Sequence, residues 1–176
     1  MPAESFPRPG DDEYAPFYAG YISGVPDGDL LETLTHQLDE MLVLCGSLVE
    51  AQGDLAYAEG KWTIKEVIGH MNDAERIFAY RALRIARGDA TPLPGFDENA
   101  YTPESGAAGR TLADLAEEFA TVRRATLSLL ASLTPDAAAR RGTASNQPAS
   151  ARAIAWTIAG HAGHHLRILR ERYLGQ

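Results

Sequence analysis

The sequence predicts an all-α protein that folds as a four-helix bundle. Four segments repeat their apolar residues at the three- and four-residue spacing of one helix face. No segment alternates apolar and polar residues for long enough to predict a strand. Amphipathic helices with one apolar stripe each bury those stripes against one another, and four of them make a bundle.

The length of the chain predicts one domain. Its 176 residues are enough for a single core, so we expect one domain over residues 1–176. We expect the acidic, proline-rich residues 1–13 to be flexible. Residues 14–28 predict an arm packed on the bundle, because their aromatic density is high for a disordered tail. The aromatic residues of this arm are Tyr14, Phe17, Tyr18 and Tyr21.

The first two helices carry clear start signals. The first is expected over residues 29–49, with Asp29 as the N-terminal cap. The second is capped by Thr63, and Glu66 completes a capping box three residues later. An arginine followed by glycine at residues 87–88 predicts its end.

The last two helices lie in the second half of the chain. The third is expected from Thr111, with Pro135 closing it, and the fourth from near Ser150 to about Tyr173. The connection over residues 89–110 is long. A long connection in a compact domain is often either functional or a crossover.

Composition excludes several classes of function. The net charge is −8, which argues against nucleic acid as a partner because such proteins carry basic patches. No apolar run approaches the roughly 18 residues of a membrane span, and no signal peptide is recognisable, so we expect a cytoplasmic protein with no membrane partner. Cys45 has the spacing of a buried apolar residue, and one cysteine allows no internal disulfide.

The fourth helix contains three histidines within GHAGHHLRIL: His161, His164 and His165. At about 100° per residue, His161 and His165 lie at the centre of the apolar stripe, and His164 lies on its flank. Two buried imidazoles one turn apart need a partner for each nitrogen, and a divalent metal supplies one to both. The alternative is two core histidines that are hydrogen bonded separately.

A metal site needs a third ligand from another helix. His36 lies well off the apolar stripe of the first helix, whereas His70 lies at the edge of the second helix's stripe. An edge residue can point into a pocket between helices, although His70 considered alone could equally be an interfacial histidine. Glu75 returns to the apolar side of the same helix, as a candidate buried polar partner.

KWTIKEVIGHMNDAERIFAYR, followed far downstream by IAGHAGHHLRIL, resembles the DinB/YfiT-like superfamily. The resemblance covers nearly the whole chain and includes the arm DEYAPFYAGYISGVPDGDLLETL. It implies a four-helix bundle in which three histidines hold a divalent metal, one from the second helix and two from an HxxxH pair in the fourth. These ligands fall on His70, His161 and His165.

A centre of three histidines leaves coordination positions open, which is a mark of catalytic rather than structural sites. All-histidine ligation favours zinc or nickel, and iron and manganese also fit. Two further residues are candidates for catalysis. His164 has no ligand role by this match and could face a substrate, and Asp73 could orient a ligand or take a proton. A solvent-facing role is an equal alternative for Asp73.

The resemblance implies three functions. The first is an enzyme whose metal activates a small-molecule thiol for attack on an electrophilic substrate, as in a bacillithiol-type S-transferase. The second is a metal-dependent hydrolase of YfiT type that uses metal-bound water. The third is a non-catalytic metal-binding stress-response protein. The resemblance also implies a homodimer.

Overall fold

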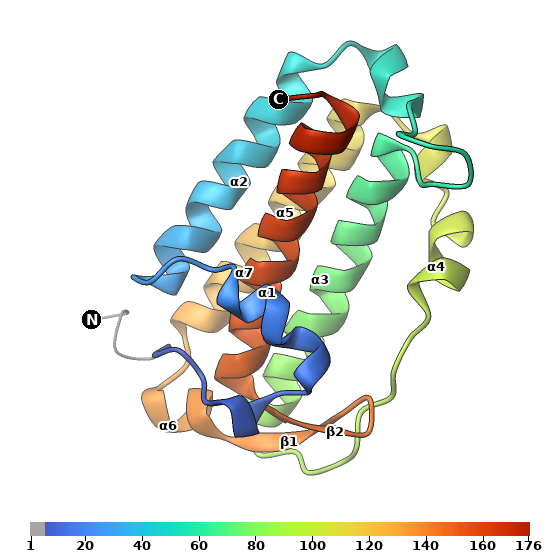
Figure 1. Ribbon diagram of the computed structural model, residues 1–176. Coiled ribbons are helices and arrows are strands. Elements are labelled where there is room, and N and C mark those ends of the chain that lie inside the picture. The colour runs from blue at the N-terminus through green and yellow to red at the C-terminus, as the bar shows by residue number, and fades with distance from the viewer. Residues whose placement is uncertain (1–5) are drawn as a thin grey trace.

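A computed structural model describes residues 6–176 and contains four long helices, which form a bundle (Figure 1). These helices are α2 (Leu30–Ser47), α3 (Ile64–Ala86), α5 (Leu112–Ala131) and α7 (Ala151–Ile168). A π-helical turn, η6 (Leu169–Tyr173), continues α7. The predicted fold class is therefore confirmed.

Each long helix begins where a side chain caps its first turn. Asp29 accepts hydrogen bonds from the amides of residues 31 and 32, and Thr63 accepts one from the amide of Glu66. Glu66 in turn accepts from the Thr63 amide at 2.8 Å, which completes the predicted capping box. Thr111 and Ser150 cap α5 and α7 in the same way. The four predicted helix starts are confirmed.

The long connection between α3 and α5 is a crossover. Figure 1 shows α2 and α7 running toward one end of the bundle and α3 and α5 running toward the other. Because α3 and α5 pack side by side and are parallel, the chain must return along the whole bundle between them. The returning segment contains α4 (Glu98–Glu104) and the short turn η5 (Ala107–Gly109).

The structure corrects the expectation that the chain contains no strand. After a short helix, α6 (Pro135–Ala139), strands β1 (Arg141–Ala144) and β2 (Gln147–Ser150) form an antiparallel hairpin. Its two-residue turn has positive φ at Ser145 (53°) and Asn146 (60°), as such tight hairpins require. Strands of four residues are too short for an alternating pattern to be recognised in the sequence.

An N-terminal arm lies across the bundle. It contains η2 (Asp11–Glu13), η3 (Pro16–Tyr18) and α1 (Ala19–Ser23), and α1 packs on α7. The two helices can approach closely because α7 carries a glycine there: a Cβ atom on Gly160 would lie 2.2 Å from the Tyr21 carbonyl oxygen.

The described part of the arm begins to pack earlier than expected. We expected flexibility over residues 1–13; residues 1–5 lie outside the described residues, but Phe6 and Glu13 are buried. The guanidinium of Arg8 lies 4.4 Å from the centre of the Trp156 ring. Glu13 forms two hydrogen bonds to Arg152 of α7, at 2.7 and 2.5 Å. These contacts hold the arm to the bundle from residue 6 onward.

The pair between Glu13 and Arg152 predicts a pH-dependent stability. The hydrogen bonds from Arg152 lower the pKa of Glu13 to about 2. The pair therefore stabilises the fold fully above the ordinary pKa of 4.5, and this stabilisation is lost as pH falls toward 2. We expect Glu13→Gln to lower the free energy of unfolding by roughly 1–3 kcal/mol at pH 7. Urea unfolding of both proteins at several pH values measures the difference.

The matched control is Glu117→Gln, which breaks an exposed pair with Arg124 and is expected to change stability by less than about 1 kcal/mol. The difference between wild type and Glu13→Gln should shrink between pH 4.5 and pH 2. An equal difference at pH 7 and pH 2.5 would show that the ion pair is not its cause.

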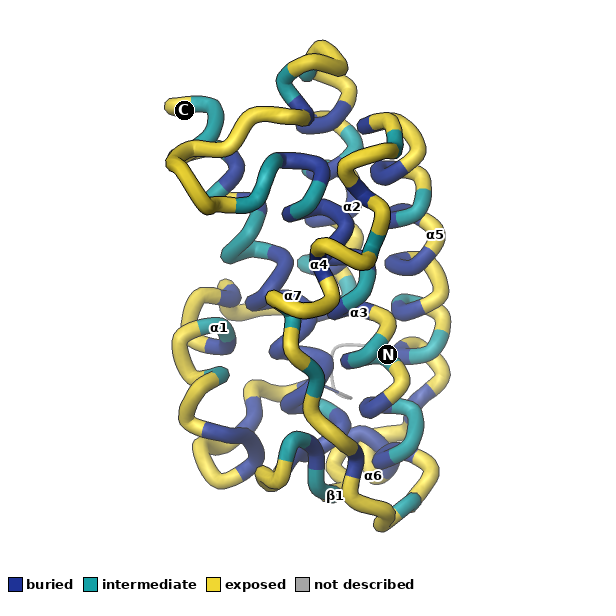
Figure 2. The backbone as a smooth tube through the Cα atoms, turned by 90° about the vertical axis from the view of Figure 1, so that its right-hand side faces the viewer, coloured by how far each residue is buried: buried dark blue, intermediate teal, exposed yellow. Residues whose placement is uncertain are grey.

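The interior of the bundle contains two apolar clusters separated by polar side chains. In Figure 2, the buried residues of the long helices lie toward the inside of the bundle. The cluster near the hairpin contains Leu34, Phe78, Ile85, Leu130 and Ile154. The other cluster contains Leu38, Met41, Ile68, Leu115 and Leu166. Five buried polar side chains lie at or near the boundary between the clusters: Gln37, His70, Glu75, Arg123 and His161. Among the helices of residues 6–176, none has the length and apolar character that a membrane crossing needs.

A buried ion pair connects all four long helices. Arg123 of α5 donates two hydrogen bonds of 2.7 Å to the carboxylate of Glu75 on α3. It also donates to the Leu34 carbonyl (2.9 Å) and to Oε1 of Gln37 (3.3 Å), both on α2. The amide nitrogen of Gln37 then donates to the Ala159 carbonyl of α7 at 2.8 Å. Glu75 is therefore a buried polar partner, on the side of α3 that the sequence indicated.

Candidate metal centre

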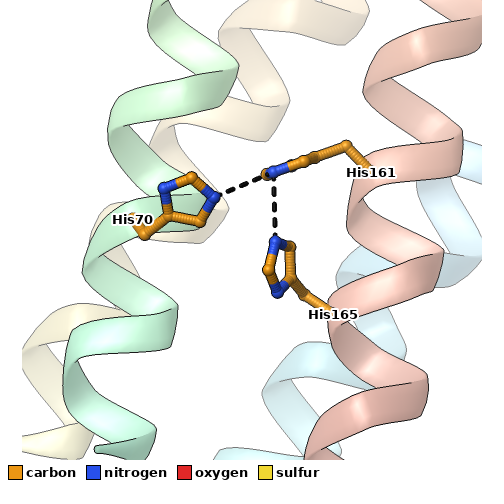
Figure 3. Close-up of side chains that lie close together, drawn as sticks. All are labelled: His70, His161 and His165. Carbon is orange, nitrogen blue, oxygen red and sulfur yellow. Dashed lines mark hydrogen bonds between the residues drawn. The ribbon is translucent and has the colours of Figure 1, made fainter. Parts of the chain in front are cut away.

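Three histidine side chains from two helices meet at one point inside the bundle (Figure 3). Nε2 of His161 lies 3.0 Å from Nε2 of His70 and 3.1 Å from Nε2 of His165. The ligand atoms of all three lie within 4.8 Å of one another. His70 and His161 are buried, and His165 is partly exposed.

Local helix geometry explains this convergence. His161 and His165 are four residues apart on α7, so their rings project from the same face one turn apart. His70 stands at the edge of the apolar stripe of α3, and α3 packs directly on α7. An edge position on one helix thus faces the central stripe of the next helix, and the three residues selected from the sequence are brought together.

The donor set fits a divalent cation better than it fits hydrogen bonds between the rings. A neutral imidazole has one N–H and one in-plane lone pair, so Nε2 of His161 cannot make good hydrogen bonds to both neighbouring Nε2 atoms. Zinc–nitrogen bonds are about 2.0–2.1 Å long, which places neighbouring ligand nitrogens about 2.9–3.4 Å apart. The two Nε2–Nε2 separations, 3.0 and 3.1 Å, fall in this range.

Burial keeps the three rings neutral. Desolvation lowers the pKa of His70 to about 4, against a smaller opposing effect of the Glu98 carboxylate. Desolvation, followed by the charges of His70 and His164, lowers the pKa of His165 to about 3. The pKa of His161 is lowered well below its usual value, mainly by desolvation. At neutral pH each ring therefore has a free lone pair, as metal ligation requires.

Two separate cavities reach the histidines. A cavity of about 190 Å³ is lined by His70, His161 and Glu98, together with aromatic side chains of the arm and of α3. A second, of about 250 Å³, is lined by His165, Lys61 and Asn99 and by other residues. Because Glu98 and Asn99 are consecutive residues of α4, the start of this helix lies between the two cavities.

Aromatic rings form the walls around the cluster. The ring centres of Tyr21 and Phe78 each lie 5.7 Å from that of His161, in edge-to-face geometry. The Trp62 ring centre lies 4.9 Å from that of His70. These rings exclude water from the buried side of the cluster and lower the local dielectric constant, which strengthens electrostatic interactions there.

His164 does not join the three histidines and lies on the flank of the apolar stripe of α7, as the sequence predicts. Its ring is edge-to-face to Tyr21 at 5.2 Å between ring centres, and its Nδ1 lies 3.4 Å from the Arg167 guanidinium. Desolvation, followed by the charges of Arg167 and Arg172, lowers its pKa. His36 is exposed on α2, off the apolar stripe as expected.

Asp73, a candidate catalytic residue, lies in a different cavity from the three histidines. It lines a cavity of about 620 Å³ between α3 and α4, together with Arg76 and Tyr101, and does not join the three histidines. The carboxylate that lines the histidine cavity is that of Glu98, which sequence reasoning missed. Asp97 caps α4 by accepting from two backbone amides. The cap is readable in FDENAY, but the position of this crossover helix over the cluster is not.

Comparison with known proteins places the chain among related folds. The model of the DinB superfamily matches residues 33–169. A solved structure, that of YfiT from Bacillus subtilis, is described as a probable metal-dependent hydrolase with an unusual four-helix bundle topology. It matches with a TM-score of 0.76 and 16% sequence identity over 98% of both chains, and this likeness shows a shared fold. No curated protein matches the sequence.

Proposed function

Since this chain belongs to the DinB superfamily, we propose that it is a metal-dependent enzyme in which His70, His161 and His165 hold one divalent cation. The observation that carries the proposal is the meeting of three desolvated histidines, in which Nε2 of His161 lies 3.0 and 3.1 Å from the Nε2 atoms of the other two, at separations that suit a shared metal. Zinc or nickel suits an all-histidine donor set, and iron and manganese are compatible with it.

The residues around the three histidines suit activation of a nucleophile. A divalent cation held here would lower the pKa of a thiol or water that binds to it. Glu98 offers a carboxylate in the same cavity as His70 and His161, where it can accept the released proton. The rings of Tyr21, Trp62 and Phe78 keep bulk water away from the cluster.

We favour an externally supplied small-molecule thiol as the nucleophile, as in a bacillithiol-type S-transferase. Two cavities that reach the histidines from either side of α4 suit a reaction between two molecules. Lys61 and Asn99 offer hydrogen-bond donors to a polar thiol beside His165, and the aromatic cavity suits an electrophile. The protein's own Cys45 is buried in the core, and burial raises its pKa to about 11, so it is a poor nucleophile.

Hydrolysis is the second candidate. It is supported by the description of YfiT, which shares the fold, and by the carboxylate of Glu98, which could accept a proton from water. The third alternative is a metal-binding protein without catalysis. It would require a further protein ligand to close the metal's coordination, and His164 and Asp73, the two candidates for that role, point elsewhere.

One experiment separates these functions. The protein is purified without a histidine tag, its metal content is measured, and turnover is followed with an electrophile plus several small thiols and, separately, with esters. Metal- and thiol-dependent consumption of the electrophile supports the transferase. Metal-dependent ester cleavage without thiol supports the hydrolase. Full metal content without either activity would favour the non-catalytic alternative, and absence of bound metal would contradict the proposal as a whole.

We expect His164→Ala to retain one metal per chain and the wild-type fold but to lower turnover. Its ring packs beside Tyr21 and His165 but is not one of the three proposed ligands. Its loss should therefore alter the side chains that surround the site without lowering metal affinity. Metal content and turnover are measured side by side with His165→Ala as the comparison. Loss of metal in His164→Ala, with retention in His165→Ala, would show that the ligand pair is HxxH instead of HxxxH.

A further inference from the structure

A further cavity, between α3 and the crossover, has an unusual charge. It occupies about 280 Å³ between α3 and residues 93–101 of the crossover. Its lining includes two arginines, Arg76 and Arg81, and no carboxylate. This contrasts with the chain as a whole, which has 24 acidic and 16 basic residues. The lining therefore offers positive charge in an acidic protein.

Arg81 is the buried cation of this cavity. Only 3% of the residue is exposed, and it forms no ion pair with an acidic side chain of residues 6–176. Its Nη2 donates to the Pro94 carbonyl at 2.7 Å and to Oγ of Ser145 at 3.1 Å. Within the described chain, its Nε and Nη1 have no hydrogen-bond partner. Burying a guanidinium without an anion is costly, so an anionic ligand would gain a strong interaction here.

The remaining lining is mostly apolar and aromatic. The Arg81 guanidinium lies 5.8 Å from the centre of the Phe96 ring, which also borders the cavity. Tyr80 and Tyr101 stand at the cavity with about half of each residue exposed, at 49% and 48%. Ile77 and Leu93 complete the apolar surface. A ligand that fits has an apolar body and one compact negative group.

Arg76 does not compete for the role of anion partner. Its Nη1 is hydrogen bonded to Glu118 at 2.5 Å, and half of its side chain is exposed, so its charge is already balanced and screened. Arg81 thus provides the charge that selects the ligand, and Arg76 adds positive potential near the entrance.

We propose that this cavity is a binding site for a small amphipathic carboxylate, with the Arg81 guanidinium as its anion partner. The planar fork of arginine matches the two oxygens of a carboxylate, and the aromatic and aliphatic side chains cover the ligand's apolar part. Arg81 follows His70 by 11 residues on α3, which is about 16 Å along the helix, so Arg81 lies apart from the three histidines, and Phe96 borders both cavities. The proposal does not depend on the metal or on the reaction.

Phenylacetate and its neutral amide, phenylacetamide, are suitable probes. Each is titrated into the full-length protein while the Nε–H resonances of the arginines are followed by NMR, with the Arg81 signal assigned from Arg81→Lys. We expect phenylacetate to shift the Arg81 resonance with saturation and phenylacetamide to leave it unchanged. A shift of the Arg81 resonance with both probes, or with neither, would overturn the proposal.

A second variant tests the site without removing Arg81. Ile77 precedes Arg81 by four residues on α3, so Ile77→Glu places an acidic side chain within reach of the guanidinium. This internal carboxylate should weaken phenylacetate binding by about tenfold or more, as expected for loss of a charge-assisted hydrogen-bonded pair. The matched control, Ile77→Gln, has nearly the same shape as Ile77→Glu without the charge, and loses the same apolar contact. It should therefore bind phenylacetate at least about tenfold more tightly than Ile77→Glu does. Equal binding by both variants would contradict the role of Arg81.

Discussion

Replacement of both His161 and His165 by alanine is expected to abolish stoichiometric metal binding. The two residues supply two of the three nitrogens that meet in the bundle, and one remaining imidazole cannot compete with water and buffer for a divalent ion. Metal content after dialysis, measured by mass spectrometry on untagged protein, gives the result. His36→Ala is the matched control, because His36 is an exposed histidine of α2.

The melting temperatures of the same variants provide a second test of metal binding. A metal that binds only the folded chain stabilises it, so adding zinc should raise the melting temperature of the wild type and of His36→Ala. It should leave the melting temperature of the double variant unchanged. Full metal content in the double variant would contradict the assignment of these histidines as ligands.

The largest loss of stability is expected from Arg123→Met. Arg123 is fully buried, and its removal leaves the carboxylate of Glu75 in the core without a partner. Breaking a buried pair in this way costs about 3–5 kcal/mol of unfolding free energy. Urea unfolding measures it, and Arg124→Met, which removes the exposed neighbour on the same helix, should cost less than about 1 kcal/mol.

A double variant identifies the cause of that loss. In Arg123→Met combined with Glu75→Met no buried charge remains, so the protein should be more stable than Arg123→Met alone. Because Gln37 ties this network to the Ala159 carbonyl, two residues before His161, Arg123→Met is also expected to weaken metal binding. If Arg123→Met is no less stable than Arg124→Met, the buried ion pair adds little to the free energy of unfolding.

The sequence alone determined the features that depend on a few neighbouring residues. The caps at Asp29, Thr63, Thr111 and Ser150 were readable because a side chain and the amides it binds lie within three residues. The directions of the histidines on α7 followed from the fixed rotation of about 100° per residue. For this reason His161 and His165 could be separated from His164 before any tertiary contact was known.

Tertiary structure alone decided which distant segments meet. Glu98 lies 28 residues after His70 in the sequence, and only the path of the crossover brings α4 to the histidine cavity. The same packing directs Asp73 to another cavity and pairs Glu75 with Arg123. Helix periodicity states which face a residue occupies, but not what lies opposite that face. The opposite surface is selected when segments far apart in the chain bury their apolar stripes together, and this sum of many weak contacts leaves no local pattern in the sequence.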